Sequence, residues 1–193
     1  LEAGCGLGHF TVAANVLGYR AEGLDWSSPT IDRLRSQFGR ITWHVGDVRE
    51  LQFEDDSFDA IYSPGVCEHF REGPERVLTE TRRVLRPGGF AVVSSPCFNE
   101  WLQRRVPTLA ADEPVNEATF YEYAFSPSGM AAVLERLGFR VLQIRPYGAL
   151  DTLECYGGWR VPRHLKDALA FGLDYLPVIR NWGSTCIWVA QKL

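Results

Sequence analysis

A short run with three glycines near the start of the chain places the tightest limit on its fold. Gly4, Gly6 and Gly8 alternate with other residues in the run 2–8 (EAGCGLG), after a short apolar stump and before a helical pattern. Glycine permits a sharp turn and a close approach of the backbone to a ligand, and the following helix N-terminus offers free N–H groups. The run therefore predicts a strand-to-helix turn that binds a nucleotide-like ligand at the carboxyl edge of a parallel sheet.

The spacing of these glycines narrows the kind of ligand. A dinucleotide-binding fingerprint has the form GxGxxG and needs a third glycine where this chain has His9. The chain has the form GxGxG, preceded by Glu2. This difference disfavours an NAD-dependent oxidoreductase, and a tight turn without a ligand is a further alternative.

The rest of the chain alternates between β-like and helical patterns, which is typical of a sheet with crossover helices. We expect a doubly wound, Rossmann-like α/β fold. The clearest break is Pro87-Gly88-Gly89, which separates a helical pattern from a near-continuous apolar strand. The predicted strands are 1–3, 20–25, 41–46, 58–63, 90–94, 139–145 and 185–190, and the main predicted helices are 10–17, 29–38, 74–85 and 127–137.

The length and composition fit a single domain over residues 1–193. The chain is 46% hydrophobic and 23% charged, which suffices for a sizeable core. The stretches 97–125 and 147–183 are too long for plain connections, so we expect two insertions with helices or a lid of their own. The chain opens on Leu1 and its only methionine is Met130, so we expect the first strand to be truncated by the start of the chain.

Charge and cysteine content exclude several other classes of protein. A net charge of -4 lacks the basic footprint that nucleic-acid binding needs. No apolar run approaches the roughly 18 residues of a membrane span. The five cysteines are scattered without a CxxC pair, which suits neither a disulfide framework nor a zinc site and indicates a reducing compartment. We therefore expect a cytoplasmic protein with neither a transmembrane segment nor a nucleic-acid partner.

Acidic residues end the second and third predicted strands, on the edge where the glycine run also lies. A carboxylate at Asp25 is suited to accept hydrogen bonds from both hydroxyls of a ribose. The Asp47 carboxylate is suited to accept a hydrogen bond from the amino group of an adenine. The alternatives are a helix N-cap for Asp25 and a solvated turn for Asp47. Three such features at successive strand ends favour a nucleoside-containing ligand.

With these motifs in view, the chain resembles the class I S-adenosylmethionine-dependent methyltransferases, in particular the type 11 group. The resemblance covers nearly all of residues 1–145. It rests on EAGCGLG, GLDWS, VGDVREL, FDAIYSPGVCEHF and RVLRPGGFAVVSSP, in this order. It implies a seven-stranded sheet of order 3-2-1-4-5-7-6 with the last strand antiparallel, so that residues 185–190 insert between 90–94 and 139–145.

The resemblance also implies S-adenosylmethionine as the cofactor, with S-adenosylhomocysteine as its product. At the amino-acid end of the cofactor it assigns Gly4, Gly6 and Gly8 to backbone contacts. Glu2 is expected to hold the ammonium group, directly or through water.

The nucleoside end of the cofactor is assigned in the same way. The resemblance gives the ribose hydroxyls to Asp25, with Trp26 packing beside the adenine. Asp47 and Val48 are expected to flank that base, and Ser63 to lie under the sulfonium end.

A histidine is the candidate for the chemistry of transfer. Glu68-His69 is the acid–histidine pair nearest the expected methyl position, and an imidazole titrates near neutral pH. We expect His69 to act as base or to position the acceptor, the alternative being a histidine bonded to backbone. Methyltransferases that bind a metal beside such a pair carry a second glutamate shortly before it, where this chain has Gly65-Val66-Cys67. We therefore expect no metal.

Together these features predict an enzyme that transfers a methyl group from S-adenosylmethionine by in-line displacement. The acceptor is expected to be a small molecule or a lipid- or glycan-linked group, bound by the insertions 97–125 and 147–183 because loops at this edge supply specificity. Aromatic residues near arginines in the first insertion suit an apolar or aromatic acceptor with an anionic group. The alternative is an inactive domain that binds the cofactor and acts as a regulatory or interaction module.

Overall fold

A seven-stranded sheet organises the chain. The computed structural model describes residues 1–99, 102, 104, 121–156, 160–162, 165–176, 179 and 181–193. The strands are β1 Glu2–Ala3, β2 Gly23–Asp25, β3 Trp43–Val45, β4 Phe58–Pro64, β5 Leu85–Pro96, β6 Phe139–Tyr147 and β7 Thr185–Lys192. The helices are α1 His9–Val16, α2 Ser28–Gln37, the 3-10 helix η1 Cys67–His69, α3 Glu75–Val84, α5 Pro127–Arg136, α6 Ala149–Tyr156 and α7 Lys166–Tyr175.

The strand order is β3-β2-β1-β4-β5-β7-β6, which confirms the order expected from the resemblance. Neighbouring strands from β3 to β5 pair in parallel. Strand β7 lies antiparallel to both β5 and β6, so β6 runs in the same direction as β5. The carboxyl ends of β1 to β6 therefore share one edge of the sheet with the start of β7.

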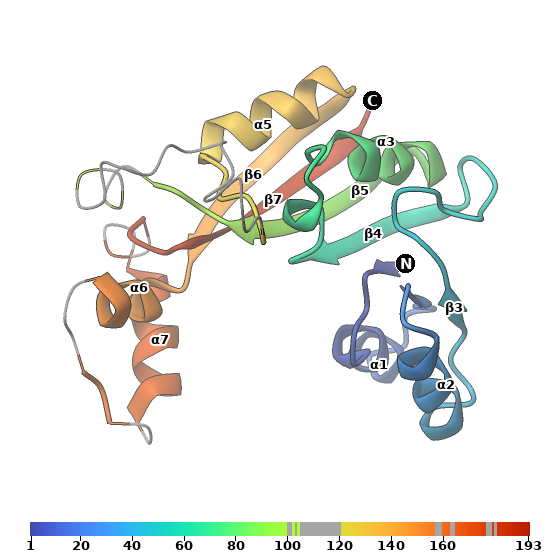
Figure 1. The fold of residues 1–193 in the computed structure, drawn as a ribbon, viewed down its shortest axis with the longest axis horizontal. Helices are drawn as coiled ribbons and strands as arrows, with labels where there is room; N and C mark the ends of the chain where they lie inside the picture. Colours follow the sequence, from blue (N-terminus) through green and yellow to red (C-terminus); the bar gives the residue numbers. More distant parts are fainter. Residues whose placement is uncertain are drawn as a thin grey trace.

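Helices cover both faces of the sheet, as in a doubly wound fold. Helices α3 and α5 lie on one face and α1 and α2 on the other (Figure 1). A large core cluster joins Leu78 of α3 and Leu134 of α5 to Ile61, Val93 and Trp188 of the sheet. Helix α2 packs Ile31 and Leu34 against Trp43 in a second cluster. The two cores together hold the strand ends, and hence the loops between strands and helices, in fixed positions.

Helix α3 forms where the apolar spacing of the sequence predicts it. Val77, Leu78, Thr81 and Val84 are buried on one side, which is the amphipathic pattern of a helix on a sheet. Glu75 in the first turn and the basic residues of the last turn complement the helix dipole. The helix spans 75–84 against an expected 74–85, a difference within the ordinary uncertainty of helix ends.

The Pro-Gly-Gly break is one expectation that the structure corrects. Strand β5 begins at Leu85, opposite Phe58, and pairing resumes at Phe90 opposite Ala60. Residues 86–89 therefore form an irregular bulge inside β5 instead of a loop before it. Pairing overrides the turn signal because Leu85 is fully buried in the core and anchors the strand on the near side of the glycines.

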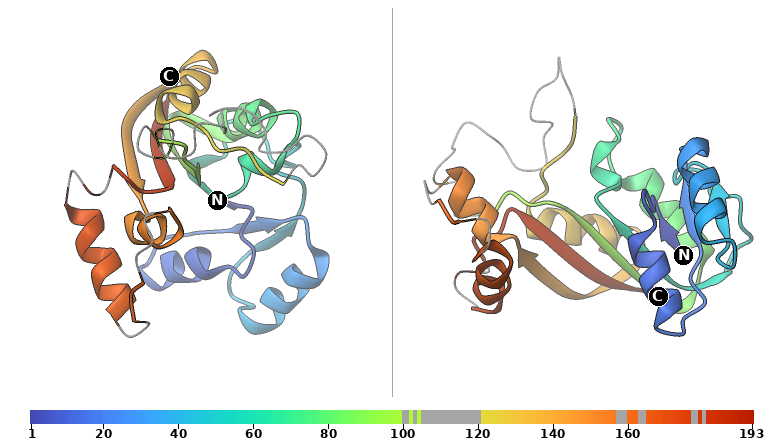
Figure 2. Two further views of the ribbon diagram at one scale, coloured as in Figure 1. Left: turned by 60° about the vertical axis from the view of Figure 1, so that its left-hand side comes forward. Right: turned by 90° about the horizontal axis from the view of Figure 1, so that it is seen from below.

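Both insertions leave the sheet at the shared edge. The backbone N–H of Cys97, just after β5, donates to Ser184 O at 2.7 Å, and Asn99 Nδ2 donates to Gly183 O at 2.6 Å. Helices α6 and α7 of the second insertion pack on each other, beyond the end of β6 (Figure 2). Of the aromatic and arginine residues that we expect to bind the acceptor in the first insertion, Trp101, Arg105 and Phe120 lie outside the described residues.

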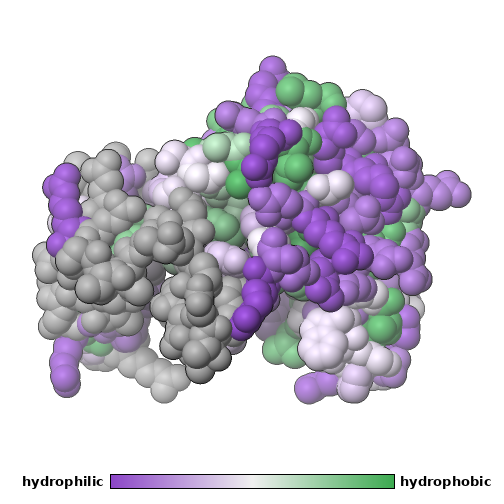
Figure 3. All heavy atoms as spheres, turned by 45° about the horizontal axis from the view of Figure 1, so that its top comes forward, coloured by the Kyte–Doolittle hydropathy of each residue, from purple (hydrophilic) through white to green (hydrophobic). Residues whose placement is uncertain are grey.

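Because apolar side chains are buried in these cores, we expect mainly polar side chains on the outer surface. On the face seen in Figure 3, most of the described side chains are hydrophilic and the hydrophobic ones form small separate groups. Within the described part of the chain, no helix has the length and low polarity that crossing a lipid bilayer requires.

Candidate active site

A cleft of about 420 Å³ opens at the shared edge of the sheet, between the loops that follow β1, β2, β3 and β4. We refer to it as the cofactor cleft. Its walls are more apolar than polar, as is usual for small-molecule sites. The lining residues are Gly4, Asp25, Trp26, Gly46, Asp47, Val48, Arg49, Gly65, Val66, His69 and Phe70.

The glycine run forms a tight turn at one side of this cleft. Gly4, Gly6 and Gly8 have φ angles of 82°, 47° and 71°, in the left-handed region that favours glycine. At Gly4 there is a second constraint, because an added Cβ would lie 2.4 Å from Val66 Cγ2. Gly8 is the N-cap of α1. The turn and the loop after β4 thus meet in van der Waals contact, and only glycine fits between them.

Asp25 is held in place by backbone donors. Gly6 N donates to its Oδ2 and Ser27 N donates to its Oδ1, both at 2.9 Å. The side chain is 8% exposed and faces the cofactor cleft. Each carboxylate oxygen keeps a second lone pair after these bonds. The Ser27 side chain does not cap α2, so Asp25 orients the turn and still offers acceptors to a diol.

Trp26 and Val48 line the cleft where the adenine was expected. The Trp26 side chain is 81% exposed, an unusual state for the largest apolar side chain, which typically packs against a partner. Val48 is buried. These two residues lie in the cofactor cleft, and their contact with adenine remains a prediction.

Asp47 has a strong partner that the sequence analysis missed. Arg49 Nη2 donates to Asp47 Oδ2 at 2.8 Å, and Arg49 N donates to Oδ1 at the same distance. Hydrogen bonds from Arg49 hold the pKa of Asp47 below its usual value. Arg49 also bonds Glu72 and lies over the ring of Phe70 at 4.7 Å. A hydrogen bond from an adenine amino group to Asp47 therefore requires Arg49 to give up part of this pairing.

Glu2 and Ser63 lie behind the cofactor cleft and do not line it. The buried Glu2 carboxylate accepts hydrogen bonds from the backbone and the hydroxyl of Thr11, and burial raises its pKa. Ser63 Oγ donates to Ala3 O at 2.9 Å and links β4 to β1. Their expected contacts with the cofactor remain predictions, and both residues also hold the glycine run against the sheet.

A second group of polar side chains adjoins the cleft after β4. Glu68, His69 and Glu122 each offer one ligand atom, and these atoms lie within 4.8 Å of one another. We call these three residues the Glu68 cluster. His69 alone among them lines the cofactor cleft, and Glu122 comes from the far end of the first insertion.

Glu68 is the most unusual member of the Glu68 cluster. Its side chain is 1% exposed, and no described residue provides a hydrogen-bond partner for its Oε2. Burial raises the pKa of Glu68 to about 7. In the sequence this glutamate stands out only as the neighbour of His69, and nothing there connects either residue to Glu122.

The cysteines near the site have no activated thiol. Burial raises the pKa of Cys5 to about 12, and burial also raises the pKa of Cys67. A thiol is a nucleophile only as thiolate. These two residues therefore behave as small buried apolar groups.

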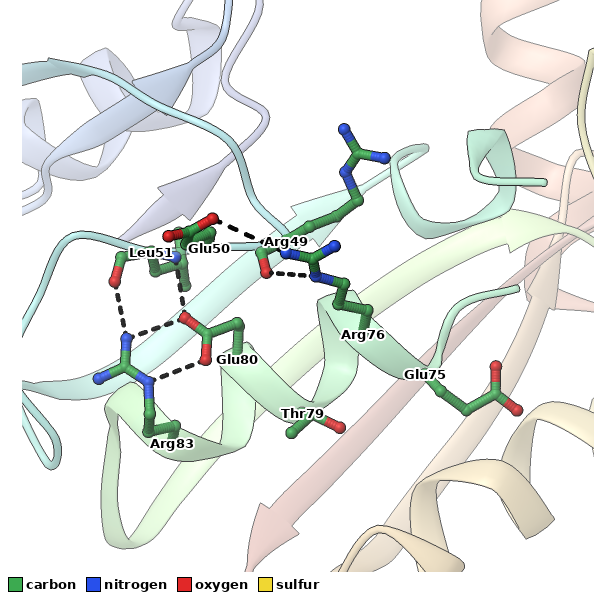
Figure 4. A pocket seen from close by; sticks show the side chains of 8 residues that line it. All are labelled: Arg49, Glu50, Leu51, Glu75, Arg76, Thr79, Glu80 and Arg83. Atoms are coloured by element: carbon green, nitrogen blue, oxygen red, sulfur yellow. Dashed lines mark hydrogen bonds and ion pairs between the residues drawn. The ribbon is translucent and has the colours of Figure 1, made fainter. Parts of the chain in front are cut away.

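A larger hollow lies beside helix α3 but does not resemble a binding site. It is lined by charged side chains of α3 and of residues 49–51 (Figure 4). Arg83 donates to Glu80 at 2.9 Å and Arg76 lies 3.7 Å from Glu50. Because these charges already pair with one another on an open surface, the smaller and more apolar cofactor cleft is the better candidate.

Comparison with known proteins agrees with this choice. A family model described as a methyltransferase domain, of type 11, matches residues 1–93, which contain every residue of the cofactor cleft. A protein of Mycolicibacterium smegmatis, named a probable S-adenosylmethionine-dependent methyltransferase, is 32% identical over 141 residues. Residues 1–93 thus match a methyltransferase domain, and the chain is similar in sequence to S-adenosylmethionine-dependent methyltransferases.

Two further relatives differ in what they methylate. The malonyl-[acyl-carrier protein] O-methyltransferase of Yersinia pestis is 33% identical over 95 residues, 49% of this chain and 35% of the relative. The structure of the 1,6-didemethyltoxoflavin-N1-methyltransferase of Burkholderia thailandensis, with S-adenosylhomocysteine bound, covers 99% of this chain and 69% of its own, with a TM-score of 0.63 and 20% identity. The likeness to this methyltransferase extends to the fold and not to an acceptor.

The match to the Mycolicibacterium smegmatis protein covers 73% of this chain and about half of the relative, 51%. The name of this relative gives S-adenosylmethionine as its cofactor, and the described residues of this chain fit that molecule. The cleft has a glycine turn that a Cβ would block, a buried carboxylate with free lone pairs and an exposed indole.

Proposed function

We propose that this methyltransferase transfers a methyl group from S-adenosylmethionine to a small-molecule or lipid- or glycan-linked acceptor. The observation that carries the proposal is the position of Asp25, whose carboxylate is buried, oriented by Gly6 N and Ser27 N, and directed at the cofactor cleft. We assign the ribose hydroxyls to Asp25, and the amino-acid end of the cofactor to Gly4, Gly6, Gly8 and Glu2.

The remaining cofactor contacts follow the walls of the cleft. We assign the adenine to Trp26, Val48 and Asp47, with Arg49 adjusting its pairing to admit the base. Ser63 supports the sulfonium end from beneath the sheet edge. When bound, the cofactor supplies an electrophilic methyl group whose leaving group is a neutral thioether.

The chain's own task is to hold the acceptor in line with that methyl group and to exclude water. The acceptor lone pair forms the new bond to carbon while the carbon–sulfur bond breaks with its electrons on sulfur. Where the acceptor is a hydroxyl, phenol or ammonium, a proton must also leave. His69 lines the cleft, and its Nδ1 lies 3.1 Å from Tyr121 O. We assign it to holding the acceptor or receiving that proton.

We further propose that residues 1–193 act as one domain and that the insertions 97–125 and 147–183 bind the acceptor. Both leave the sheet at the edge that carries the cofactor cleft, and the two are tied together between Asn99 and Gly183. Among the described residues of the first insertion, Tyr121, Tyr123 and Phe125 present aromatic rings beside the Glu68 cluster. This setting suits an acceptor with an apolar or aromatic body.

Calorimetric titration of the full chain with S-adenosylhomocysteine tests the cofactor, with NAD as the control. We expect binding of S-adenosylhomocysteine alone. It should also stabilise the fold, by about 2.7 kcal/mol at a hundredfold excess over its dissociation constant. Binding of NAD, or of neither compound to folded protein, contradicts the proposal.

Methyl transfer from a radiolabelled cofactor to a panel of acceptors then separates the enzyme from a regulatory module. The panel includes phenols, carboxylates, amines and lipid- or glycan-linked groups. Turnover of any of them supports the enzyme. Tight cofactor binding without turnover of any class favours the module that only binds the cofactor.

A further inference from the structure

Although the sequence led us to expect no metal here, we propose that the Glu68 cluster binds one divalent transition-metal ion beside the cofactor cleft, with Glu122 as the second carboxylate. Its three ligand atoms lie within 4.8 Å of one another. Bonds of about 2.0–2.2 Å from nitrogen and oxygen to a metal put the ligand atoms of one ion roughly 3–4.4 Å apart. Small rotations of exposed and half-buried side chains are enough to close this difference.

The buried carboxylate of Glu68 is the observation that points to a ligand. Most buried polar atoms in folded proteins have a partner, and one without a partner calls for an explanation such as a bound ion. Glu68 Oε2 is such an atom within the described part of the chain. A surface cluster of acids needs no cation, because water satisfies it, whereas Glu68 is 1% exposed. A cation between Glu68 and Glu122 supplies the missing partner.

The backbone fixes Glu122 in the position that the site requires. On one side of it, the carbonyl of Tyr121 lies 3.1 Å from His69 Nδ1. On the other side, Tyr123 N donates to Glu68 O at 2.9 Å. Phe125 N then donates to Pro96 O at the end of β5. Residues 121–125 are thus attached to η1 and to the sheet, and Glu122 is held between its two prospective co-ligands.

The hydrogen bond of His69 also leaves the ring in the form that binds metal. A carbonyl oxygen accepts only, so Nδ1 must carry the proton that it shares with Tyr121 O. In the neutral ring Nε2 then keeps its lone pair. Histidine ligands in metalloproteins commonly donate their second N–H to a carbonyl in this way, which fixes the tautomer and the ring orientation.

The donor set indicates which cations fit. Two carboxylates and an imidazole combine hard oxygen ligands with nitrogen, which suits Mn²⁺, Fe²⁺, Co²⁺ or Zn²⁺ better than Ca²⁺ or Mg²⁺. The two negative charges balance the charge of the ion. Three protein ligands leave coordination positions open, as in catalytic rather than structural sites.

An acceptor class follows, and this step rests on the proposed function. An acceptor hydroxyl or phenol oxygen that occupies an open position on the ion loses its proton to water more readily. The oxygen lone pair then attacks the methyl carbon as the carbon–sulfur bond breaks. In this arrangement His69 is a ligand and cannot also serve as the base, because both roles use the same lone pair.

Titration of metal-free full chain tests the site, with Mn²⁺ followed by electron paramagnetic resonance and Zn²⁺ by calorimetry. We expect one equivalent of Mn²⁺ to bind, and Glu122→Gln to weaken binding at least tenfold. Glu135→Gln is the matched control, since Glu135 is an exposed glutamate on α5, and it should bind like the unmodified chain. Absent binding at millimolar Mn²⁺ and Zn²⁺, or equal affinity in Glu122→Gln, overturns the site.

Titration of the same samples with S-adenosylhomocysteine separates this inference from the proposed function. Glu122 does not line the cofactor cleft, so Glu122→Gln should bind S-adenosylhomocysteine like the unmodified chain, which also reports that it folds. Cofactor binding without metal binding overturns the metal site alone. Metal binding without cofactor binding contradicts the proposed function and leaves the metal site in place.

Discussion

The cofactor loops, by which we mean residues 4–8, 25–27 and 46–49, differ from the Glu68 cluster in how their polar groups are satisfied. In the cofactor loops each carboxylate has donors close by. Asp25 accepts from Gly6 N and Ser27 N, and Asp47 is paired with Arg49. In the Glu68 cluster, by contrast, one oxygen of a buried carboxylate lacks a partner among the described residues.

The two regions therefore differ in how far their polar groups are satisfied before a ligand binds. The cofactor loops are complete before the ligand arrives, so binding adds hydrogen bonds to acceptors that are already oriented. The Glu68 cluster is held in place by backbone bonds, and its unpartnered carboxylate oxygen requires either a proton or a positive charge beside it. Fully satisfied polar networks rigidify a structure, whereas partly satisfied ones are costly. The cost is consistent with a group retained for function.

His69 lies where the two regions meet, and its removal should have the largest effect. We expect His69→Ala to slow methyl transfer about 100-fold, with nearly unchanged affinity for S-adenosylhomocysteine. This is the lower end for loss of a positioned acid–base group and the upper end for a disturbed metal site, so it holds for either role of His69. Steady-state kinetics and calorimetry measure the two quantities. His44→Ala is the control, because His44 lies on β3, where its ring bonds the Glu22 side chain. Full activity in His69→Ala would remove the residue from the reaction.

Substitution of Gly4 tests how tightly the cofactor loops pack against the loop that follows β4. Gly4→Ala should lower the free energy of unfolding by about 2–3 kcal/mol through left-handed strain and a clash, because its φ is +82° and the new Cβ lies 2.4 Å from Val66 Cγ2. Gly18→Ala isolates the strain, since Gly18 has φ +90° and open space around it. Denaturant titration should show a smaller loss there, and Val66→Ala should partly rescue Gly4→Ala. Equal losses at both glycines contradict the clash.

Asp25 tests the ligand that the cofactor loops are prepared for. Asp25→Ala should weaken S-adenosylhomocysteine binding by about 1.5–3 kcal/mol, the scale of hydrogen bonds to a charged group. Asp32→Ala on the exposed side of α2 should leave the dissociation constant as it is. The ribose assignment fails if calorimetry finds the same dissociation constant for Asp25→Ala and the unmodified chain.

The pH dependence of the free energy of unfolding tests whether Glu68 is a buried carboxyl group without a full set of partners. Burial raises the pKa of Glu68 to about 7, with His69 favouring the charged form and Glu122 opposing it. The folded state therefore binds this proton more tightly than the unfolded state does. The resulting stability is full below the unfolded pKa of about 4.3 and is lost as the pH rises through 7.

Glu68→Gln cannot lose that proton, so its stability relative to the unmodified chain should increase between pH 4.5 and 8. The change should be about 3 kcal/mol. Denaturant titrations at several pH values with a chelator present measure it. Glu135→Gln serves as the control and should show a difference that does not vary with pH. A flat difference for Glu68→Gln would mean that Glu68 is not buried as a strained carboxylate.

Local sequence signals predicted most of the elements correctly. The apolar spacing of residues 74–85 corresponds to α3 within one residue at each end, and the strand predicted at 58–63 corresponds to β4. The Pro87-Gly88-Gly89 signal predicted a break, yet the pairing of Leu85 with Phe58 extends β5 across it. The order of the strands followed from the family resemblance and not from any local pattern.

The residues of the candidate site also fall into two groups, those that the sequence predicts and those that only the folded chain reveals. The glycine turn and the position of Asp25 at the sheet edge could be predicted because they depend on backbone conformation and on donors within the same loops. Arg49 was missed although it follows Asp47 by two residues, since only the folded loop shows that its guanidinium turns back onto that carboxylate.

The sequence by itself therefore determined the turns and acids of the cofactor loops, because these features act over a few residues at successive strand ends. Only the tertiary structure decided the composition of the Glu68 cluster. Glu122 reaches Glu68 and His69 because residues 121–125 bond to η1 and to the end of β5. Contacts between segments so far apart in the chain arise from packing and have no counterpart in residue spacing.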